Sequence, residues 1–118
     1  MNKHTAGLNG QQAAEDYLIK KGLTILHRNY RVRTGEIDLI ARDGAYFIFI
    51  EVKARHSNKY GLPREAVTPA KQNKIIRTAQ HYLMRYQLAD VDVRFDVVEV
   101  IWTEGAVHIE HLENAFWG

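Results

Sequence analysis

The chain has 118 residues, a net charge of +2, 46% hydrophobic and 25% charged residues, and no cysteine. This composition is typical of one globular domain, and it excludes disulfides, thiolate zinc sites and cysteine nucleophiles. No apolar stretch approaches the roughly 18 residues needed to span a bilayer, and the first twelve residues lack the apolar run of a signal peptide. We therefore expect one cytoplasmic domain over residues 1–118 and no membrane partner.

The first third of the chain predicts a helix followed by a strand. Residues 1–9 are expected to be loose, and a helix is expected over 11–21, where apolar residues recur at helical spacing before Gly22. Residues 23–30, LTILHRNY, predict a strand, and residues 31–34 a polar link.

Residues 35–55, GEIDLIARDGAYFIFIEVKAR, predict a hairpin that turns at Asp43-Gly44. With that turn, Asp38 lies opposite Phe49 and Glu36 opposite Glu51. Side chains alternate between the faces of a strand, so four charged residues share one face: Glu36, Asp38, Glu51 and Lys53. The other face carries apolar residues suited to packing on a helix: Ile37, Leu39, Ile50 and Val52.

Acidic side chains inside strands need a compensating partner. Asp38 and Glu51 are expected to be diagonal neighbours at roughly 7–8 Å, close enough to share one cation. Two carboxylates, with the Val52 carbonyl as a further ligand, suit Mg²⁺ or Mn²⁺, which can polarise a phosphodiester and activate water. Lys53 is placed to stabilise phosphoryl charge or orient that water. The alternative is a partly buried ion pair between Lys53 and one acid.

The second half of the chain predicts a helix between strands. Residues 56–67 are expected to be irregular, and Thr68 and Pro69 predict a helix start. An apolar stripe follows, comprising Ile75, Ile76, Ala79, Tyr82, Leu83 and Tyr86. Tyr82 and Tyr86 lie on this stripe, as Tyr17 does on that of the first helix, which favours core positions over base-stacking ones.

Two more strands are expected, over 91–102 and 106–110, with a turn at Glu104-Gly105, and a tail whose Phe116 and Trp117 pack on the body. A hairpin followed by a crossover helix and a return strand predicts an α/β fold. Its mixed sheet has about five strands flanked by helices.

For three charged residues outside the hairpin turn, we expect structural ion pairs rather than roles in catalysis or metal binding. Glu36 is expected to pair with Arg33 or Arg94 more readily than to act at a metal. Arg94 and Asp96 are expected to form cross-strand pairs.

Basic residues gather directly after the acidic cluster. From residue 53 to residue 77 there is one acid, Glu65, among Lys53, Arg55, Lys59, Arg64, Lys71, Lys74 and Arg77. This distribution suits an anionic polymer. Lys71 and Lys74, at the start of the second helix, are candidates for phosphate contacts, and the alternative is a solvated helix face.

An ordered set of motifs resembles a known family. The set comprises YLIKKGLTILHRNYR, GEIDLIARDG, FIEVKAR, YGLPREAVTPAKQNKI, RFDVVEV and HLENAFW. It resembles the YraN-type family of bacterial predicted endonucleases, in the PD-(D/E)xK nuclease superfamily, which is related to archaeal Holliday junction resolvases. The resemblance extends over nearly the whole chain.

The resemblance implies a restriction-endonuclease-like fold with a metal site at Asp38, Glu51 and Lys53. The family usually has a glutamate on the first helix where this chain has Gln11, and Glu15 or Glu36 are the candidates to replace it. A homodimer is a further expectation by analogy.

Three functions remain open at this stage. The first is a Mg²⁺- or Mn²⁺-dependent DNA endonuclease, structure-specific for branched or junction DNA, in which Arg55, Lys71 and Lys74 hold the phosphate backbone. The second is a non-catalytic nucleic-acid-binding module that keeps the nuclease fold, as Gln11 favours. The third is a protein-interaction domain whose acidic cluster is structural.

Overall fold

The computed structural model describes residues 3–56 and 67–116, with side chains from residue 10 onward. The elements, in chain order, are α1 (Lys3–Lys20), β1 (Thr24–Val32), β2 (Gly35–Asp43), β3 (Tyr46–His56), α2 (Pro69–Arg85), β4 (Asp92–Thr103) and β5 (Ala106–Phe116). The strands form one sheet in the order β1-β2-β3-β4-β5. Among the strands of the described residues, only the β3–β4 pair is parallel, and α2 lies between these two strands in the chain. The predicted α/β fold, consistent with a restriction-endonuclease-like architecture, is confirmed.

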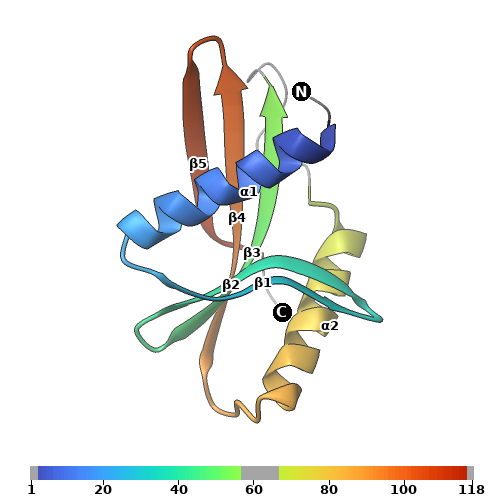
Figure 1. The fold of residues 1–118 in the computed structure, drawn as a ribbon. Coiled ribbons are helices and arrows are strands. Elements are labelled where there is room, and N and C mark those ends of the chain that lie inside the picture. Colours follow the sequence, from blue (N-terminus) through green and yellow to red (C-terminus); the bar gives the residue numbers. More distant parts are fainter. Residues whose placement is uncertain (1–2, 57–66, 117–118) are drawn as a thin grey trace.

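The two helices pack on opposite faces of this sheet (Figure 1). Ala14 and Leu18 of α1 are buried with residues of β2, β3 and β4, including Ile48, Val98 and Val100. On the other face, α2 is buried against a separate cluster with an aromatic centre, comprising Tyr30, Phe49, Tyr82, Phe95 and Phe116. None of the helices in the described part of the chain is long and apolar enough to cross a membrane.

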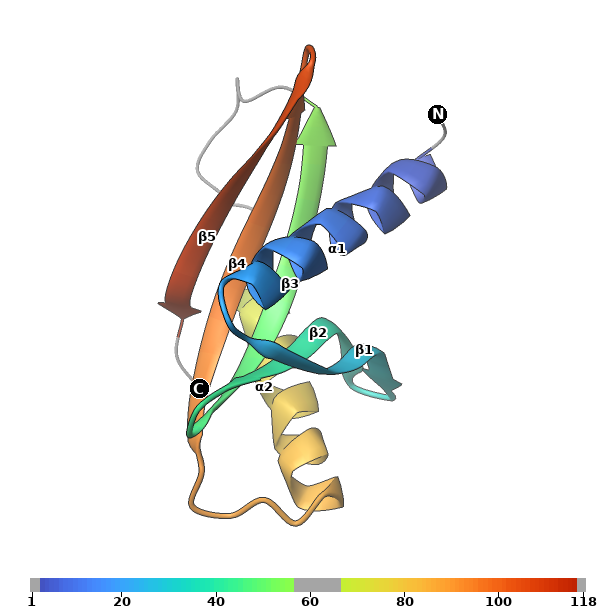
Figure 2. The ribbon, with the colours of Figure 1, turned by 60° about the vertical axis from the view of Figure 1, so that its left-hand side comes forward.

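The β1–β2 hairpin is steeply inclined to the long strands β3 and β4 (Figure 2). Because of that inclination, only the second half of β2 pairs with β3, along the first half of β3. The pairs run from Leu39↔Ile50 to Asp43↔Tyr46. The upper half of β3 continues beside β4, as far as His56↔Trp102. This separation of β2 from β3 positions the candidate site.

The helix predictions were right in kind and wrong at some boundaries and positions. Helix α1 begins at Lys3, so residues 3–9 are helical rather than loose. Helix α2 starts as predicted, with the Thr68 side chain accepting from the Lys71 N–H. Thr78, expected away from the apolar stripe, is fully buried beneath the end of the β1–β2 hairpin, and its hydroxyl donates to the Lys74 carbonyl. Tyr86, expected on the stripe, caps the helix and is 42% exposed.

The strand predictions erred mainly in length. Strand β1 extends to Val32, and β5 extends to Phe116 rather than stopping at Glu110. Phe116 packs in the core as expected, while Trp117 and most of the region predicted to be irregular, residues 57–66, lie outside the described residues. The predicted turn at Glu104-Gly105 joins β4 to β5.

Candidate functional site

Asp38 and Glu51 lie at the point where β2 and β3 separate. The last paired residues are Leu39 and Ile50, and Asp38 and Glu51 are the next residues along each strand. The Val52 N–H donates to Asp38 Oδ2 at 2.8 Å, in place of a backbone partner. The two carboxylates are therefore held side by side where the backbone ladder ends.

The hairpin turn differs from the predicted one, and the difference brings the acids closer. The two turn residues are Gly44 and Ala45, so Asp43 pairs with Tyr46. Asp38 is consequently aligned with Glu51 and not with Phe49. The shift is an even number of residues, so Asp38 and Glu51 stay on one face as predicted. Ile37 was predicted on the face of Leu39 and Ile50, and this is wrong, because it packs in the cluster on the α2 side.

Burial and nearby negative charge make both carboxylates difficult to ionise. Burial raises the pKa of Asp38, and the nearby charge of Glu36 adds to that effect. Burial and the charge of Asp38 raise the pKa of Glu51 to about 7. Like charges and desolvation both disfavour the ionised form, so the negative charge of the two carboxylates is incompletely compensated at this point of the sheet.

Two lysines from different elements reach Glu51. The Lys53 ammonium lies 3.4 Å from Glu51 Oε1. Lys71, from the first turn of α2, also lies against these groups: its contact with Lys53 lowers the pKa of Lys71, and the charge of Glu51 opposes that shift. The ion pair that the sequence left open therefore exists, but it engages Glu51 and leaves Asp38 without a salt bridge among the described residues.

Arg55 is held on the same face by Glu99, a residue that the sequence analysis missed. Arg55 Nη2 lies 2.8 Å from Glu99 Oε1, and Arg55 Nε donates to the same oxygen at 3.0 Å. Glu99 is 3% exposed and neighbours Lys53 across the β3–β4 pair. The sequence signal that could have identified Glu99 is its position as a lone acid in the apolar run VVEV of β4.

The candidate accessory acids are dispersed. Glu15 is buried against Arg28 of β1, and Glu36 pairs with Arg31 at 3.0 Å rather than with Arg33 or Arg94. Glu36 remains near enough to influence Asp38. Gln11 is half-buried beside Gly10, where α1 meets β3; a Cβ at Gly10 would lie 2.6 Å from the Ala54 Cβ.

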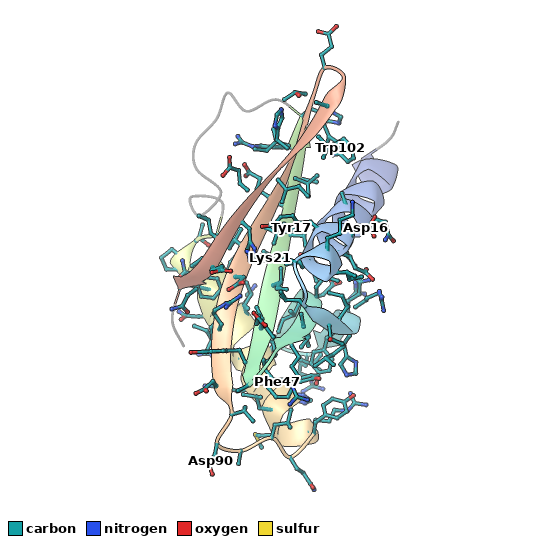
Figure 3. All side chains as sticks on the ribbon, turned by 90° about the vertical axis from the view of Figure 1, so that its left-hand side faces the viewer. Asp16, Tyr17, Lys21, Phe47, Asp90 and Trp102 are labelled. Carbon is teal, nitrogen blue, oxygen red and sulfur yellow. The ribbon has the colours of Figure 1, made fainter. Side chains whose placement is uncertain are left out.

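A second group of charges lies on the α1 face and ties α1 to β4 and β5. Asp96 is fully buried and accepts from Arg94, His111 and the Asn114 N–H. Arg94 and Asp96 thus pair within one strand and not across strands. Tyr17 of α1 and Lys21, which directly follows this helix, extend towards these strands (Figure 3), and Lys21 Nζ lies 3.1 Å from His111 Nδ1. Because each oxygen of Asp96 already accepts from these donors, this network is structurally complete.

The residues at the strand separation fit a hard divalent cation. The N–H and C=O of one strand residue point to the same edge, so the Val52 carbonyl points, with its N–H, towards Asp38. Two carboxylates and one carbonyl are oxygen ligands of the kind that Mg²⁺ combines with several waters. Among the described residues, no group of three or more acidic, histidine or cysteine side chains suits a metal, so the candidate centre has two carboxylates.

Comparison with known proteins places the chain in a family. The sequence model of uncharacterised protein family UPF0102 matches residues 10–100. The chain belongs to this family. It is the YraN-type family of the sequence resemblance, which is thereby confirmed.

Relatives of this UPF0102 protein match along almost its whole length. It is 48% identical over 113 residues to a UPF0102 protein of Clostridium acetobutylicum, covering 94% of this chain and 93% of the relative. It is 50% identical over 119 residues to one of Chlorobium chlorochromatii, covering 94% and 90%. Neither name states an activity.

Proposed function

We propose that this UPF0102 protein is a metal-dependent endonuclease that hydrolyses phosphodiester bonds of DNA. One observation carries the proposal: Asp38 and Glu51 are aligned at the strand separation, both have a raised pKa, and only one lysine salt bridge among the described residues compensates them. Carboxylates perturbed by burial and by each other are characteristic of functional sites. A bound cation would supply the missing positive charge.

Asp38, Glu51 and the Val52 carbonyl would hold that cation. Mg²⁺ or Mn²⁺ bound there supplies Lewis-acid polarisation of a phosphoryl oxygen and makes a water nucleophilic at neutral pH. Val52 also fixes the geometry through its N–H bond to Asp38. This bond leaves Asp38 Oδ1 as the oxygen available for a ligand.

The cations of the site would act on the phosphate. Lys53, next to Glu51, is placed to stabilise negative charge that develops on the phosphoryl group. Lys71 approaches the same point from α2 and would hold the substrate phosphate. Glu99 fixes the guanidinium of Arg55 on this face, so that Arg55 would meet the backbone in a defined orientation. These contacts read phosphates and not base sequence.

A second candidate function is a nucleic-acid-binding module that does not cut. Gln11 favours it, because a neutral amide cannot act as a charged ligand or base where α1 meets β3. Glu15 does not replace that acid in this arrangement, since it is engaged with Arg28. The two functions share nucleic-acid binding and differ in turnover.

Cleavage assays separate these functions. Branched, flapped, linear and single-stranded DNA would each be incubated with the protein and Mg²⁺ or Mn²⁺. The proteins compared would be wild type, Asp38→Asn, Lys53→Ala and the control Asp92→Asn. Asp92 is an exposed residue at the start of β4. The side-chain amide oxygen in Asp38→Asn could still accept from the Val52 N–H, so the fold should persist. The proposal expects wild type and Asp92→Asn to cut and the two site variants to bind without cutting. Binding without cleavage by the wild type would favour the second function, and no binding at low salt would favour protein interaction.

A further inference from the structure

Helix α2 carries an unusual charge distribution for an exposed helix. It contains no acidic residue over its 17 positions, whereas four cations project from it: Lys71, Lys74, Arg77 and Arg85. Lys71, Lys74 and Arg85 follow the spacing i, i+3, i+14, which places them on one side of the helix. Solvated helix faces usually intersperse both signs, so repulsion along this side is uncompensated within the helix.

The end of the β1–β2 hairpin packs against that side of α2 and adds more cations. Thr34 and Thr78 hydroxyls lie 3.1 Å apart, and the Tyr30 hydroxyl lies 2.9 Å from His81 Nδ1. Gly35 has a φ of +155°, and a Cβ there would be 3.1 Å from the Thr78 hydroxyl and 3.7 Å from the Lys74 Cβ. This close approach places beside α2 the end of the hairpin that carries the exposed Arg31 and Arg33.

These residues form a surface that we call the basic strip, defined as Arg31, Arg33, Lys71, Lys74 and Arg85. Strand β1 and the following turn contain no acid, like α2. One cation of the strip is partly neutralised, since Arg31 pairs with Glu36. The strip begins at the carboxylate site, where Lys71 contacts Lys53, and ends about 21 Å away at Arg85, from the 1.5 Å rise per helical residue.

An exposed aromatic ring stands at the far end of the strip. Tyr86 is 42% exposed. Its ring centroid lies 4.7 Å from that of Tyr82 and 5.3 Å from that of His27, and the Arg85 guanidinium lies 5.5 Å from it. A ring that is held by aromatic neighbours and accompanied by a cation can stack with an unpaired base. Bases inside a duplex do not offer a free face to such a ring.

We propose that the basic strip binds a single-stranded stretch of the nucleic acid that enters the carboxylate site, with one unpaired base stacked on Tyr86. The inference rests on the function proposed above, because it assigns a substrate class to that site. At the 3.4 Å spacing of a stacked strand, about 21 Å corresponds to roughly six nucleotides. A flap or frayed end longer than this would reach Tyr86, and a fully paired substrate would not.

Binding without cleavage tests the inference. Fluorescence anisotropy in EDTA would measure the affinity for labelled single strands of about four and about twelve nucleotides, which are shorter and longer than the strip. A duplex of the longer strand would be measured beside them. Each oligonucleotide would be tested as DNA and as RNA. The inference expects the longer strand to bind most tightly. Duplex binding as tight as that of the strand, or equal affinity for both strand lengths, would overturn it. The DNA and RNA arms decide which backbone the strip prefers.

Variants locate the contacts. Tyr86→Ala should lower affinity for the longer strand about 5- to 150-fold, as expected for loss of one stacked base, while Tyr86→Phe should retain it. Lys74→Ala and Arg85→Ala should each reduce the slope of log K against log salt by about 0.7. The control is Lys20→Ala, an exposed cation of α1, which should leave the slope unchanged. Thermal unfolding confirms that each variant is folded.

The result distinguishes this inference from the proposed function. Absence of cleavage in Mg²⁺, with single-strand preference intact and dependent on Tyr86, would refute the nuclease function and support the strip. Cleavage by the wild type, with Tyr86→Ala binding the long strand as the wild type does, would refute the strip alone.

Discussion

Replacing Glu51 by glutamine should stabilise the metal-free protein above neutral pH. The pKa of Glu51 rises from its ordinary 4.5 to about 7 because of burial and the charge of Asp38. Glutamine has the shape of the protonated acid and never acquires that charge. The variant therefore removes a carboxylate whose ionisation opposes folding, and it keeps the hydrogen-bonding side chain.

The magnitude follows from linkage between protonation and folding. A carboxyl group with a higher pKa in the folded than in the unfolded chain stabilises the folded state fully below pH 4.5, and this contribution is lost as the pH rises through about 7. At about 1.4 kcal/mol per pH unit, the interval from 4.5 to 7 corresponds to roughly 3 kcal/mol. Glu51→Gln should thus be about 3 kcal/mol more stable than wild type at about pH 8 in EDTA, and equal to it near pH 4.

Urea denaturation at several pH values measures this difference. Glu104→Gln is the matched control, since Glu104 is exposed in the β4–β5 turn and should change the free energy of unfolding by less than about 0.5 kcal/mol. Saturating Mg²⁺ should stabilise wild type and not Glu51→Gln, by about 2.7 kcal/mol at about one hundred times the dissociation constant. If wild type and Glu51→Gln respond identically to pH between about 4 and 8, the electrostatic account of the site is refuted.

Two further predictions concern α1. Glu15→Ala should cost about 1–3 kcal/mol of stability, because it removes a buried acceptor of Arg28. Single-turnover cleavage should be unchanged. A large loss of cleavage in a folded variant would instead make Glu15 an accessory acid. Gly10→Ala should cost about 1–3 kcal/mol, because its Cβ would lie 2.6 Å from the Ala54 Cβ. The additional change Ala54→Gly should restore much of that loss in urea denaturation, and strictly additive effects would contradict direct packing of α1 on β3.

Period-two patterning predicted which charges of the hairpin share a face, although β3 and β4 are buried on both faces at their centres. The assignment of Asp38 and Glu51 to one face survived a wrong turn, since moving the turn from Asp43-Gly44 to Gly44-Ala45 shifts the pairing by an even number of residues. The chain order of helices and strands was also predicted. Helical spacing and the Thr68 cap located α2, because local signals determine where such a helix begins.

Features that depend on tertiary contacts were not predictable from local patterns. The separation of β2 from β3 after Ile50 leaves the Val52 N–H to bond to a carboxylate. The partner of Arg55, Glu99, is 44 residues away in sequence. Lys71 joins the site only because α2 crosses between β3 and β4. The early start of α1 had no apolar repeat to reveal it.

The central claim is that Asp38 and Glu51 together hold one divalent cation where β2 and β3 separate. Titration of Mn²⁺ into the protein, followed by the electron paramagnetic resonance signal of the free ion, measures this directly. Wild type should bind one Mn²⁺ per chain, Asp38→Asn and Glu51→Gln should each lose that binding while remaining folded, and Asp92→Asn should keep it. Equal Mn²⁺ binding by wild type and both site variants, or no binding by wild type, would contradict the account.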